Sequence, residues 1–479
     1  MILWTQIPNT GNGSRPATRE PGLSWKLIGA CISLALLLGA PVRLKAQPDR
    51  VQGPLSLDQA YRLALKHNQN LHASLEEVNQ AVADLRIATS PLLPQVNLEG
   101  QSIRTKKSQI DVPDQFGSGF SQPYEYSTLR MRASQHLYQG GKRRYDRQFS
   151  RLTLKSEESR HYRLAQDVLF RVATSFYQVL LAERSIDIAE KQLDRTQRQL
   201  ERAQQRFEVG LVDRTAVLRA RVQVANGQEQ LERAQNDRAV ALENLTLELG
   251  IPNPPEQLKS PEEVLFGEEL VQPYTEQALE NRRDLQQVEQ TIEALDKRTQ
   301  SEKADLTWPE FSAEGSYTVT NEEDLFNGQD DDWQVALKAE YPLFTGWRNT
   351  AELSKARAAQ RNARARYERL RQAINAQVRS VYLDIKTQEK VITSLADQVD
   401  SSRSNYEQTI AQFNEGLASS VDVVVAEAAL TEAENRLANA RFTYQLAQIQ
   451  LKLATGTLYQ EGLDFWMDSV QASTDQSQW

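Results

Sequence analysis

The feature that most constrains this 479-residue chain is that the sequence repeats itself. An internal duplication predicts two copies of one structural unit. Upstream of residue 137 the two copies are offset by 214 or 215 residues, as in Pro94 and Pro309. Downstream the offset is 206 residues, and three segments recur there: LYQG (137–140) as LFTG (343–346), FEVGL (207–211) as FNEGL (413–417), and LELG (247–250) as LATG (453–456).

The duplication also sets the domain organisation. Each half is expected to contain a helix, two strands, a very long helix, a turn and a second long helix. The last residues, 471–479, are expected to be disordered. The predicted units are a first repeat (47–257), a linker in the equatorial region (258–270), a second repeat (271–460) and a short C-terminal tail (461–479).

Apolar residues recur every seven positions in the segments predicted to be long helices. One register holds Val172, Val179, Ile186, Leu193, Leu200 and Phe207, and the matching register holds Val378, Ile385, Ile392, Val399, Tyr406 and Phe413. A period of seven predicts helices that coil around their neighbours along their length. As one helix, the residues between Gly141 and Val209 would extend about 100 Å. An ordinary dimeric coiled coil would show the same period, so the helices alone leave that alternative open.

Four segments of about ten residues alternate between apolar and polar side chains, with aromatic residues such as Trp308 and Tyr341 near their ends. This pattern is typical of transmembrane β-strands that face lipid on one side and water on the other. The apolar positions are Val96, Leu98 and Gly100; Leu129, Met131, Ala133 and Leu137; Phe311, Ala313, Gly315, Tyr317 and Val319; and Trp333, Val335, Leu337, Ala339, Tyr341 and Leu343.

Four strands are too few to close a barrel, and an open sheet edge is not tolerated in lipid. Two chains would supply eight strands, whose inward side chains would fill the bore. Three chains would supply twelve strands and leave a lumen. The residues therefore predict a mixed α and β membrane protein, with long coiled helices and with transmembrane strands that close into a β-barrel only when chains combine.

Residues 1–46 are predicted to be a signal peptide. Arg15, Arg19 and Lys26 precede or begin an apolar run at 27–39 that is too short to span a bilayer, and Ala46 precedes a plausible cleavage point. The only cysteine, Cys31, lies in this segment, and its lipidation is the less favoured alternative because most of the apolar run follows it. The remaining chain has a net charge of −12, which argues against nucleic acid as a partner.

Three segments give a more specific indication. The run SPLLPQ (90–95) before the first strand, QRFEVGLV (205–212) and Gly416-Leu417 resemble the TolC-type outer membrane efflux proteins, also called outer membrane factors. The resemblance covers residues 54–460, including the duplication. It implies a homotrimer in the outer membrane of a diderm bacterium, in contact with outer-membrane lipid. In this trimer a coiled-coil α-helical barrel, the periplasmic tunnel, would be continuous with a twelve-stranded transmembrane β-barrel. It also implies two partners, a periplasmic adaptor (membrane fusion) protein and an inner-membrane pump.

The resemblance places the two helix-hairpin tips far from the strands, on the periplasmic side. Glycine permits the chain reversal there, and the neighbouring apolar residues offer a small surface to which an adaptor hairpin can dock. The alternative is that these residues only make the turns. The predicted docking residues are Val209, Gly210, Leu211, Val212, Gly416 and Leu417.

The family's periplasmic gate is only partly present. Asp422 matches one of its rings of aspartate, and three copies would repel one another, raise their pKa values and favour cations. Val425 stands where a second aspartate is expected, so an apolar constriction would replace that ring. The family's Tyr, Arg and Asp latch is absent, because its positions hold Phe413, Ala418 and Ala216. Asp213 and Arg214 are possible substitute tip contacts.

No set of residues points to catalysis, a cofactor or a metal ion. The histidines 67, 72, 136 and 161 form no HExxH motif and are expected at surface or equatorial positions. Gly140-Gly141-Lys142 lacks the upstream glycine of a phosphate loop. The predicted function is a passive outer-membrane channel subunit of a tripartite efflux or type I secretion system. The alternative is a periplasmic coiled-coil spacer without a pore.

Overall fold

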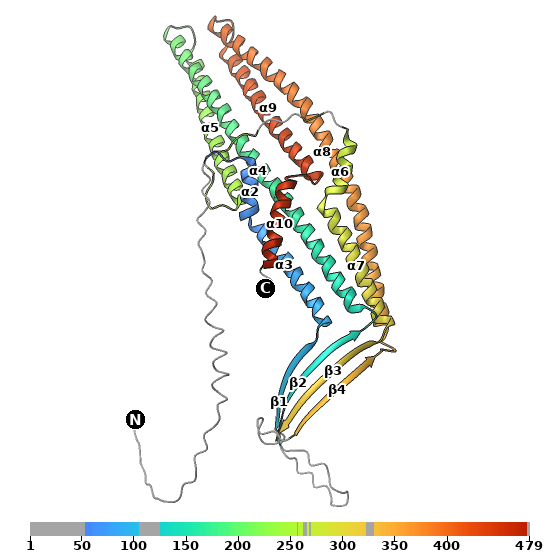
Figure 1. Ribbon diagram of the computed structural model, residues 1–479. Helices are drawn as coiled ribbons and strands as arrows, with labels where there is room; N and C mark the ends of the chain where they lie inside the picture. The colour runs from blue at the N-terminus through green and yellow to red at the C-terminus, as the bar shows by residue number, and fades with distance from the viewer. Residues whose placement is uncertain are drawn as a thin grey trace, which may run out of the picture. The chain divides into compact units, whose positions relative to one another are not determined.

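The computed structural model describes residues 53–104, 125–255, 257–261, 266–267, 270–321 and 330–476. The predicted signal peptide and Cys31 lie outside these residues. The described chain runs through two similar halves (Figure 1), which confirms the predicted duplication. The first half contains α2 (Leu57–His67), α3 (Gln69–Thr89), β1 (Gln95–Arg104), β2 (Glu125–Tyr138), α4 (Lys142–Glu208) and α5 (Arg214–Leu249). The second contains α6 (Val271–Asn281), α7 (Arg283–Thr307), β3 (Glu310–Asn321), β4 (Asp330–Glu340), α8 (Arg348–Asn414) and α9 (Ser420–Ala454), and α10 (Gln460–Gln476) follows.

The long helices α4 and α8 have 67 residues each, so each extends about 100 Å. Each forms a hairpin with the helix that follows it, and the two hairpin tips lie at the end opposite the strands (Figure 1). In the part of the chain that the structure describes, no helix combines the length and the apolar character that a membrane span requires.

Each repeat begins with two helices rather than the single helix that we predicted. The break falls at Asn68 in the first half and at the matching Arg282 in the second, both with extended backbone (ψ 123° and 117°). The side-chain amide of Asn68 donates a hydrogen bond to the Glu248 carbonyl at 2.8 Å, and the Arg282 guanidinium donates one to the Ala454 carbonyl at 3.4 Å. These carbonyls belong to the last turns of α5 and α9, which lack helical partners of their own. The break therefore caps a helix that is distant in sequence.

A glycine allows this close approach in both halves. Gly250 and Gly456 have φ values of +69° and +77° and end α5 and α9. A Cβ atom on Gly250 would lie 2.4 Å from the His67 carbonyl oxygen, and one on Gly456 would lie 2.9 Å from the Asn281 carbonyl carbon. Both obstacles are backbone atoms, so neither can move aside cheaply. Residues with side chains are therefore excluded at both positions.

The four strands form one antiparallel sheet in the order β1-β2-β3-β4. Their register puts the predicted apolar positions on one face, as in the row Leu98, Met131, Tyr317 and Trp333. The opposite face carries ion pairs, including Arg132 to Glu314 at 3.0 Å. Lys338 joins the same carboxylate. The alternation in the sequence is thus confirmed as one apolar and one charged face.

The C-terminal tail differs from the prediction. Residues 460–476 form α10, so the expectation of disorder is wrong for residues 471–476. Leu463 is fully buried in the core formed with α2, α4 and α5, and the Trp466 ring lies 5.1 Å from that of His161. His161 is itself buried and contacts the Ser74 hydroxyl at 2.5 Å, so it is not a surface residue. Packing against the first repeat explains why the tail is helical.

The close approach of Gly250 predicts a specific loss of stability. Gly250→Ala adds a methyl group against backbone in a left-handed conformation, and we expect it to cost about 3 kcal/mol. Gly210→Ala is the matched control, because Gly210 also has a positive φ (+74°) but has no atom within 4 Å of its added Cβ. Loss of helical circular dichroism on heating measures both variants. Equal melting temperatures for the two would contradict the packing argument.

Candidate functional site

The first helix of each hairpin ends in the same way. Both helices end at the hairpin tips, which we predicted to be the functional end of the molecule. At the end of α4, the Leu211 amide donates to the Arg206 carbonyl at 2.8 Å and the Gly210 amide to the Phe207 carbonyl at 3.0 Å. At the end of α8, the amides of Leu417 and Gly416 donate to Gln412 (2.8 Å) and Phe413 (3.1 Å). Both are Schellman motifs, which need a left-handed residue that is usually glycine. Gly210 and Gly416 are therefore fixed by the turn.

The predicted docking residues lie together at each tip and are open to solvent. The exposed fraction is 69% for Val209, 67% for Leu211 and 76% for Leu417. Val212 is half-buried beside them. Apolar side chains this exposed at the end of a long hairpin leave a small surface without a partner in the single chain. Adaptor docking at these residues stays a prediction.

The second helix of each hairpin begins at a capping side chain. The Asp213 carboxylate accepts a hydrogen bond from the Ala216 amide at 2.9 Å and caps α5. Ser419 caps α9, and the carboxylate of Asp422 accepts from the Ser419 amide at 2.8 Å in return. Such reciprocal bonds form a capping box. Two residues that we selected for gating or tip contacts therefore also shape their own helix starts.

The capping box changes the electrostatics of the predicted gate residue. The backbone amide and the hydroxyl of Ser419 lower the pKa of the Asp422 carboxyl, because both donate hydrogen bonds to its charged form. Within one chain, Asp422 is thus a stable anion at neutral pH. Val425 is 63% exposed one turn further along α9, as expected for a residue facing a pore. The gate assignments of both residues remain predictions.

Arg206 provides a contact between the tips that the sequence did not reveal. Its guanidinium donates a hydrogen bond to the Phe413 carbonyl and lies 4.8 Å from the centre of the Phe413 ring. The carbonyl belongs to the last turn of α8, where the helix dipole favours a cation. Phe413 stands at one of the positions where the family's polar latch is absent from this chain, so a cation–π contact takes the place of a polar contact there.

A second link between the hairpins lies further from the tip. We call it the Arg195 cluster: Arg195 on α4, Arg403 and Tyr406 on α8, and Glu427, Thr431 and Glu434 on α9. Arg195 donates to the Thr431 hydroxyl at 3.2 Å and to Glu434 at 3.4 Å. Its Nε lies 3.7 Å from a Glu427 oxygen. The cluster could not be predicted from the sequence, because Arg195 lies more than 200 residues from its partners and no motif marks them.

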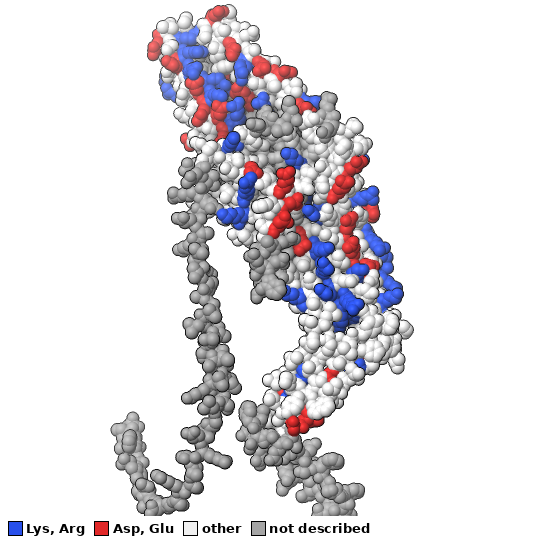
Figure 2. Space-filling model, in the orientation of Figure 1, with Lys and Arg blue, Asp and Glu red and all other residues white. Residues whose placement is uncertain are grey.

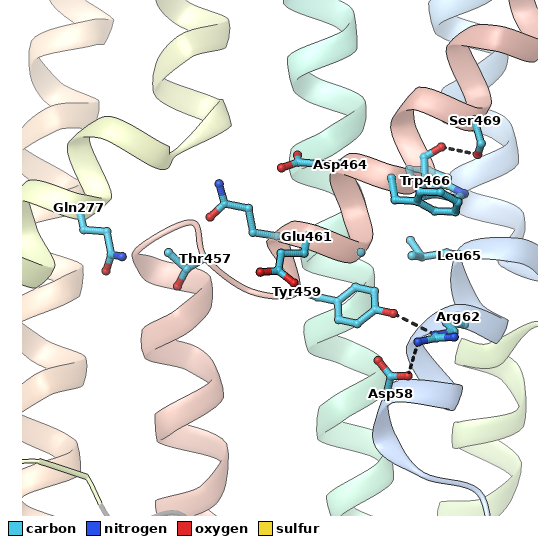
Figure 3. A pocket seen from close by; sticks show the side chains of 13 residues that line it. Asp58, Arg62, Leu65, Gln277, Thr457, Tyr459, Glu461, Asp464, Trp466 and Ser469 are labelled. Carbon is cyan, nitrogen blue, oxygen red and sulfur yellow. Dashed lines mark hydrogen bonds and ion pairs between the residues drawn. The ribbon is translucent and has the colours of Figure 1, made fainter.

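A pocket of about 1170 Å³ lies where α2, α6 and α10 meet. Figure 3 shows Arg62 between Asp58 and Tyr459 on its wall. Arg62 contacts the Asp58 carboxylate at 3.0 Å and the Tyr459 hydroxyl at 3.4 Å, and the Tyr61 and Tyr459 rings meet edge to face. These contacts attach the turn before α10 to α2. The pocket wall therefore acts as a scaffold for α10.

A group of three carboxylates lies near the start of α8, where Glu302, Asp305 and Glu352 approach within 4.8 Å. Lys142 pairs with Asp305, and Arg298 pairs with Glu302 at 2.6 Å. These cations balance most of the acidic charge. Ion pairs thus join α4 to α7 at this group, and the side-chain amide of Asn349 on α8 donates a hydrogen bond to Asp305 at 3.4 Å.

Charged side chains are distributed unevenly over the molecule. Figure 2 shows Lys, Arg, Asp and Glu interspersed over the helices, whereas the sheet is mostly without charge on the face drawn. Exposed apolar residues of the sheet include Leu98, Val335 and Leu337. A solvated helical part and an apolar sheet surface indicate two different surroundings.

Comparison with known proteins identifies the class. A family model described as outer membrane efflux protein matches residues 60–250 and 274–457, one match in each repeat. Together with the fold, the family match defines an outer-membrane channel for efflux, a transporter and not an enzyme. The chain belongs to the outer membrane efflux protein family. Membership in this family implies a trimeric channel.

Individual relatives agree with this assignment. The outer membrane protein TolC of Vibrio cholerae serotype O1 is 24% identical over 441 residues, which cover 85% of this chain and 92% of that protein. The alkaline protease secretion protein AprF of Pseudomonas aeruginosa is 25% identical over 429 residues, 86% of each chain. The crystal structure of the Campylobacter jejuni CmeC outer membrane channel shares the fold, with a TM-score of 0.75, 17% identity and coverage of 86% and 89%.

The Arg206 contact predicts how the tips respond to mutation. Arg206→Ala removes one charged hydrogen bond and one cation–π contact, which together are worth about 1–2 kcal/mol at a partly exposed site. We expect faster amide hydrogen exchange at the ends of both α4 and α8. Arg219→Ala, an exposed arginine on α5, is the control and should change neither end. Faster exchange confined to α4 would show that Arg206 does not hold the second tip.

Proposed function

We propose that three copies of this chain form the outer-membrane duct of a tripartite export system. Their twelve strands close into a barrel in the membrane, and their hairpins form a tunnel through the periplasm. Substrates pass through this duct from an inner-membrane pump and its periplasmic adaptor to the exterior. The chain itself performs no chemistry, so the pump supplies the energy.

The observation that carries the proposal is the sheet with two unpaired edges. Among the described strands, β1 and β4 each pair on one side only. Each therefore presents a row of backbone amides and carbonyls that must find partners before the sheet can enter lipid. The β4 edge of one copy can pair with the β1 edge of the next. Closure by three copies satisfies both edges and leaves a water-filled lumen.

The two faces of the sheet indicate which side of the proposed barrel is turned to lipid and which to the lumen. The apolar face, with Trp333 and Val335 exposed in the single chain, is suited to lipid. On the opposite face Arg132 and Lys338 both pair with Glu314, so this face is suited to water. A periplasmic spacer without a pore would have no use for this arrangement, so the alternative is not favoured.

The hairpins support the periplasmic part of the proposal. They extend about 100 Å from the sheet, a length comparable with the periplasm that they would cross. The apolar tip residues Val209, Leu211 and Leu417 lie at their far ends. We assign adaptor docking to these tips, and to Gly210, Val212 and Gly416 at the turns. Asp422 and Val425 narrow the lumen next to them.

Native mass spectrometry of the detergent-extracted protein tests the assembly, and conductance in planar bilayers tests the duct. We expect three chains per particle and ion conductance through single particles. One or two chains per particle, or trimers that never conduct, would contradict the proposal. The β1 edge variant Leu98→Pro, which introduces a residue that cannot donate to a neighbouring strand, should reduce the yield of trimers.

Two variants separate the charge of Asp422 from its capping role. Asp422→Asn removes the charge and keeps an oxygen that can accept from the Ser419 amide. Ser419→Ala removes the capping hydroxyl, at a cost of about 1 kcal/mol, and keeps the charge. We expect only Asp422→Asn to lower the preference of the channel for cations, measured from the reversal potential in a salt gradient. Unchanged selectivity in Asp422→Asn would remove Asp422 from the gate.

A further inference from the structure

The Arg195 cluster contains a buried carboxylate whose negative charge is stabilised by few hydrogen bonds or nearby cations. Glu427 lies between the hairpins and is only 3% exposed. Its nearest cation is Arg195, whose Nε lies 3.7 Å away, too far for a hydrogen bond. Within the described residues, neither this nitrogen nor the facing Glu427 oxygen has a hydrogen-bond partner. Burying a charge without hydrogen bonds is costly, so the charged form of Glu427 is poorly supported here.

The neighbouring carboxylate is in a different situation. Glu434 lies between two arginines, at 3.4 Å from Arg195 and 3.5 Å from Arg403. It therefore takes most of the positive charge of the cluster. Glu427 is left with one long ion pair. It is therefore the carboxylate whose buried negative charge protonation would remove at the greatest gain.

The groups around Glu427 come from three helices. On α9 the carboxylate that shares Arg195 with Glu427 is Glu434. The α8 helix contributes Tyr406, whose pKa is raised by burial and by the charge of Glu427, and Arg403. Cations face this region from α4: Arg195, with its guanidinium 6.0 Å from the Tyr406 ring, and Arg198 and Arg202 beyond it. Among these groups, Glu427 is the carboxylate that is almost completely buried and has an oxygen without a hydrogen-bond partner.

The position of Glu427 connects it to the proposed gate. It lies five residues after Asp422 on α9, which is about 7.5 Å along the helix axis. Its partner Arg195 is on α4, so the contact spans the two hairpins that must separate if the periplasmic end is to open. Separation would expose Glu427 to water.

We propose that Glu427 is a proton-controlled positioning residue of the periplasmic gate, which holds α9 against α4 while it is protonated and weakens this contact when it loses its proton. The proposal rests on the proposed function, because it assumes that the hairpins move apart on opening. It adds a residue that senses pH inside the contact, away from the lumen.

The burial of Glu427 determines which pH range favours the closed state. Burial raises the pKa of the Glu427 carboxyl to about 7, and Arg195 opposes this rise only in part. An exposed Glu in the open state would have a pKa near its usual value of 4.5. The closed state therefore binds the proton more tightly and is favoured at acidic pH. The preference for the closed state is lost as the pH rises through 7, by a factor of roughly 70 per protomer between pH 5 and pH 8.

Single-channel conductance in planar bilayers tests the proposal, with the assembled full-length protein at pH values from 5 to 8. We expect the open probability of the wild-type channel to rise at least tenfold over this range. Glu427→Gln, which stays neutral, should keep the low open probability at pH 8. Glu432→Gln, an exposed glutamate on the same helix, is the matched control and should behave as wild type.

One more variant keeps the test decisive. Arg195→Gln removes the nearest cation and should move the midpoint of opening to higher pH, a shift that loss of a merely structural contact would not produce.

The outcomes separate the inference from the function on which it rests. A channel that conducts with the same pH profile in wild type and Glu427→Gln overturns the inference and leaves the duct intact. An Arg195→Gln channel whose midpoint of opening stays at the wild-type pH would also overturn it, because Arg195 opposes the rise in the pKa of Glu427. Wild-type protein that conducts at no pH contradicts the duct itself.

Discussion

The helix α4 holds the molecule together, because it must bury its sides along about 100 Å of length. It contacts α3 and α7 towards the sheet, α5 in its own hairpin and α9 of the second hairpin. No compact core can cover a helix this long, so the partners follow one another along it. The seven-residue period in the sequence and the placement of the arginine contacts with α8 and α9 both follow from this requirement.

The sequence was most informative where burial is encoded locally. Alternation at Leu98 and Val335 predicted the two faces of the sheet, and the period through Val172 and Val378 predicted the long helices, because each pattern depends only on nearby residues. The break at Asn68 could not be predicted in this way. It depends on the Glu248 carbonyl, 180 residues away in the chain, which accepts the side-chain hydrogen bond.

The same reason explains what was missed at the candidate site. The turns at Gly210 and Gly416 carry a local signature, and the structure places them as expected. Arg206 and Glu427 carry none, because their importance comes from partners on the opposite hairpin. The helix α10 is similar, since Leu463 favours a helix only when the core of the first repeat receives it.

The length of α4 and α8 also has a mechanical consequence. A rigid rod that pivots near the sheet converts a tilt of about 5° into a tip displacement of about 9 Å over its 100 Å length. A restraint is most effective at the end of such a lever, where the arm is longest. Arg206 lies in the last turn of α4 and contacts the second hairpin. It lies further from the sheet than Arg195, so its restraint acts over the longer arm. A contact of modest energy there can resist a large torque applied at the base.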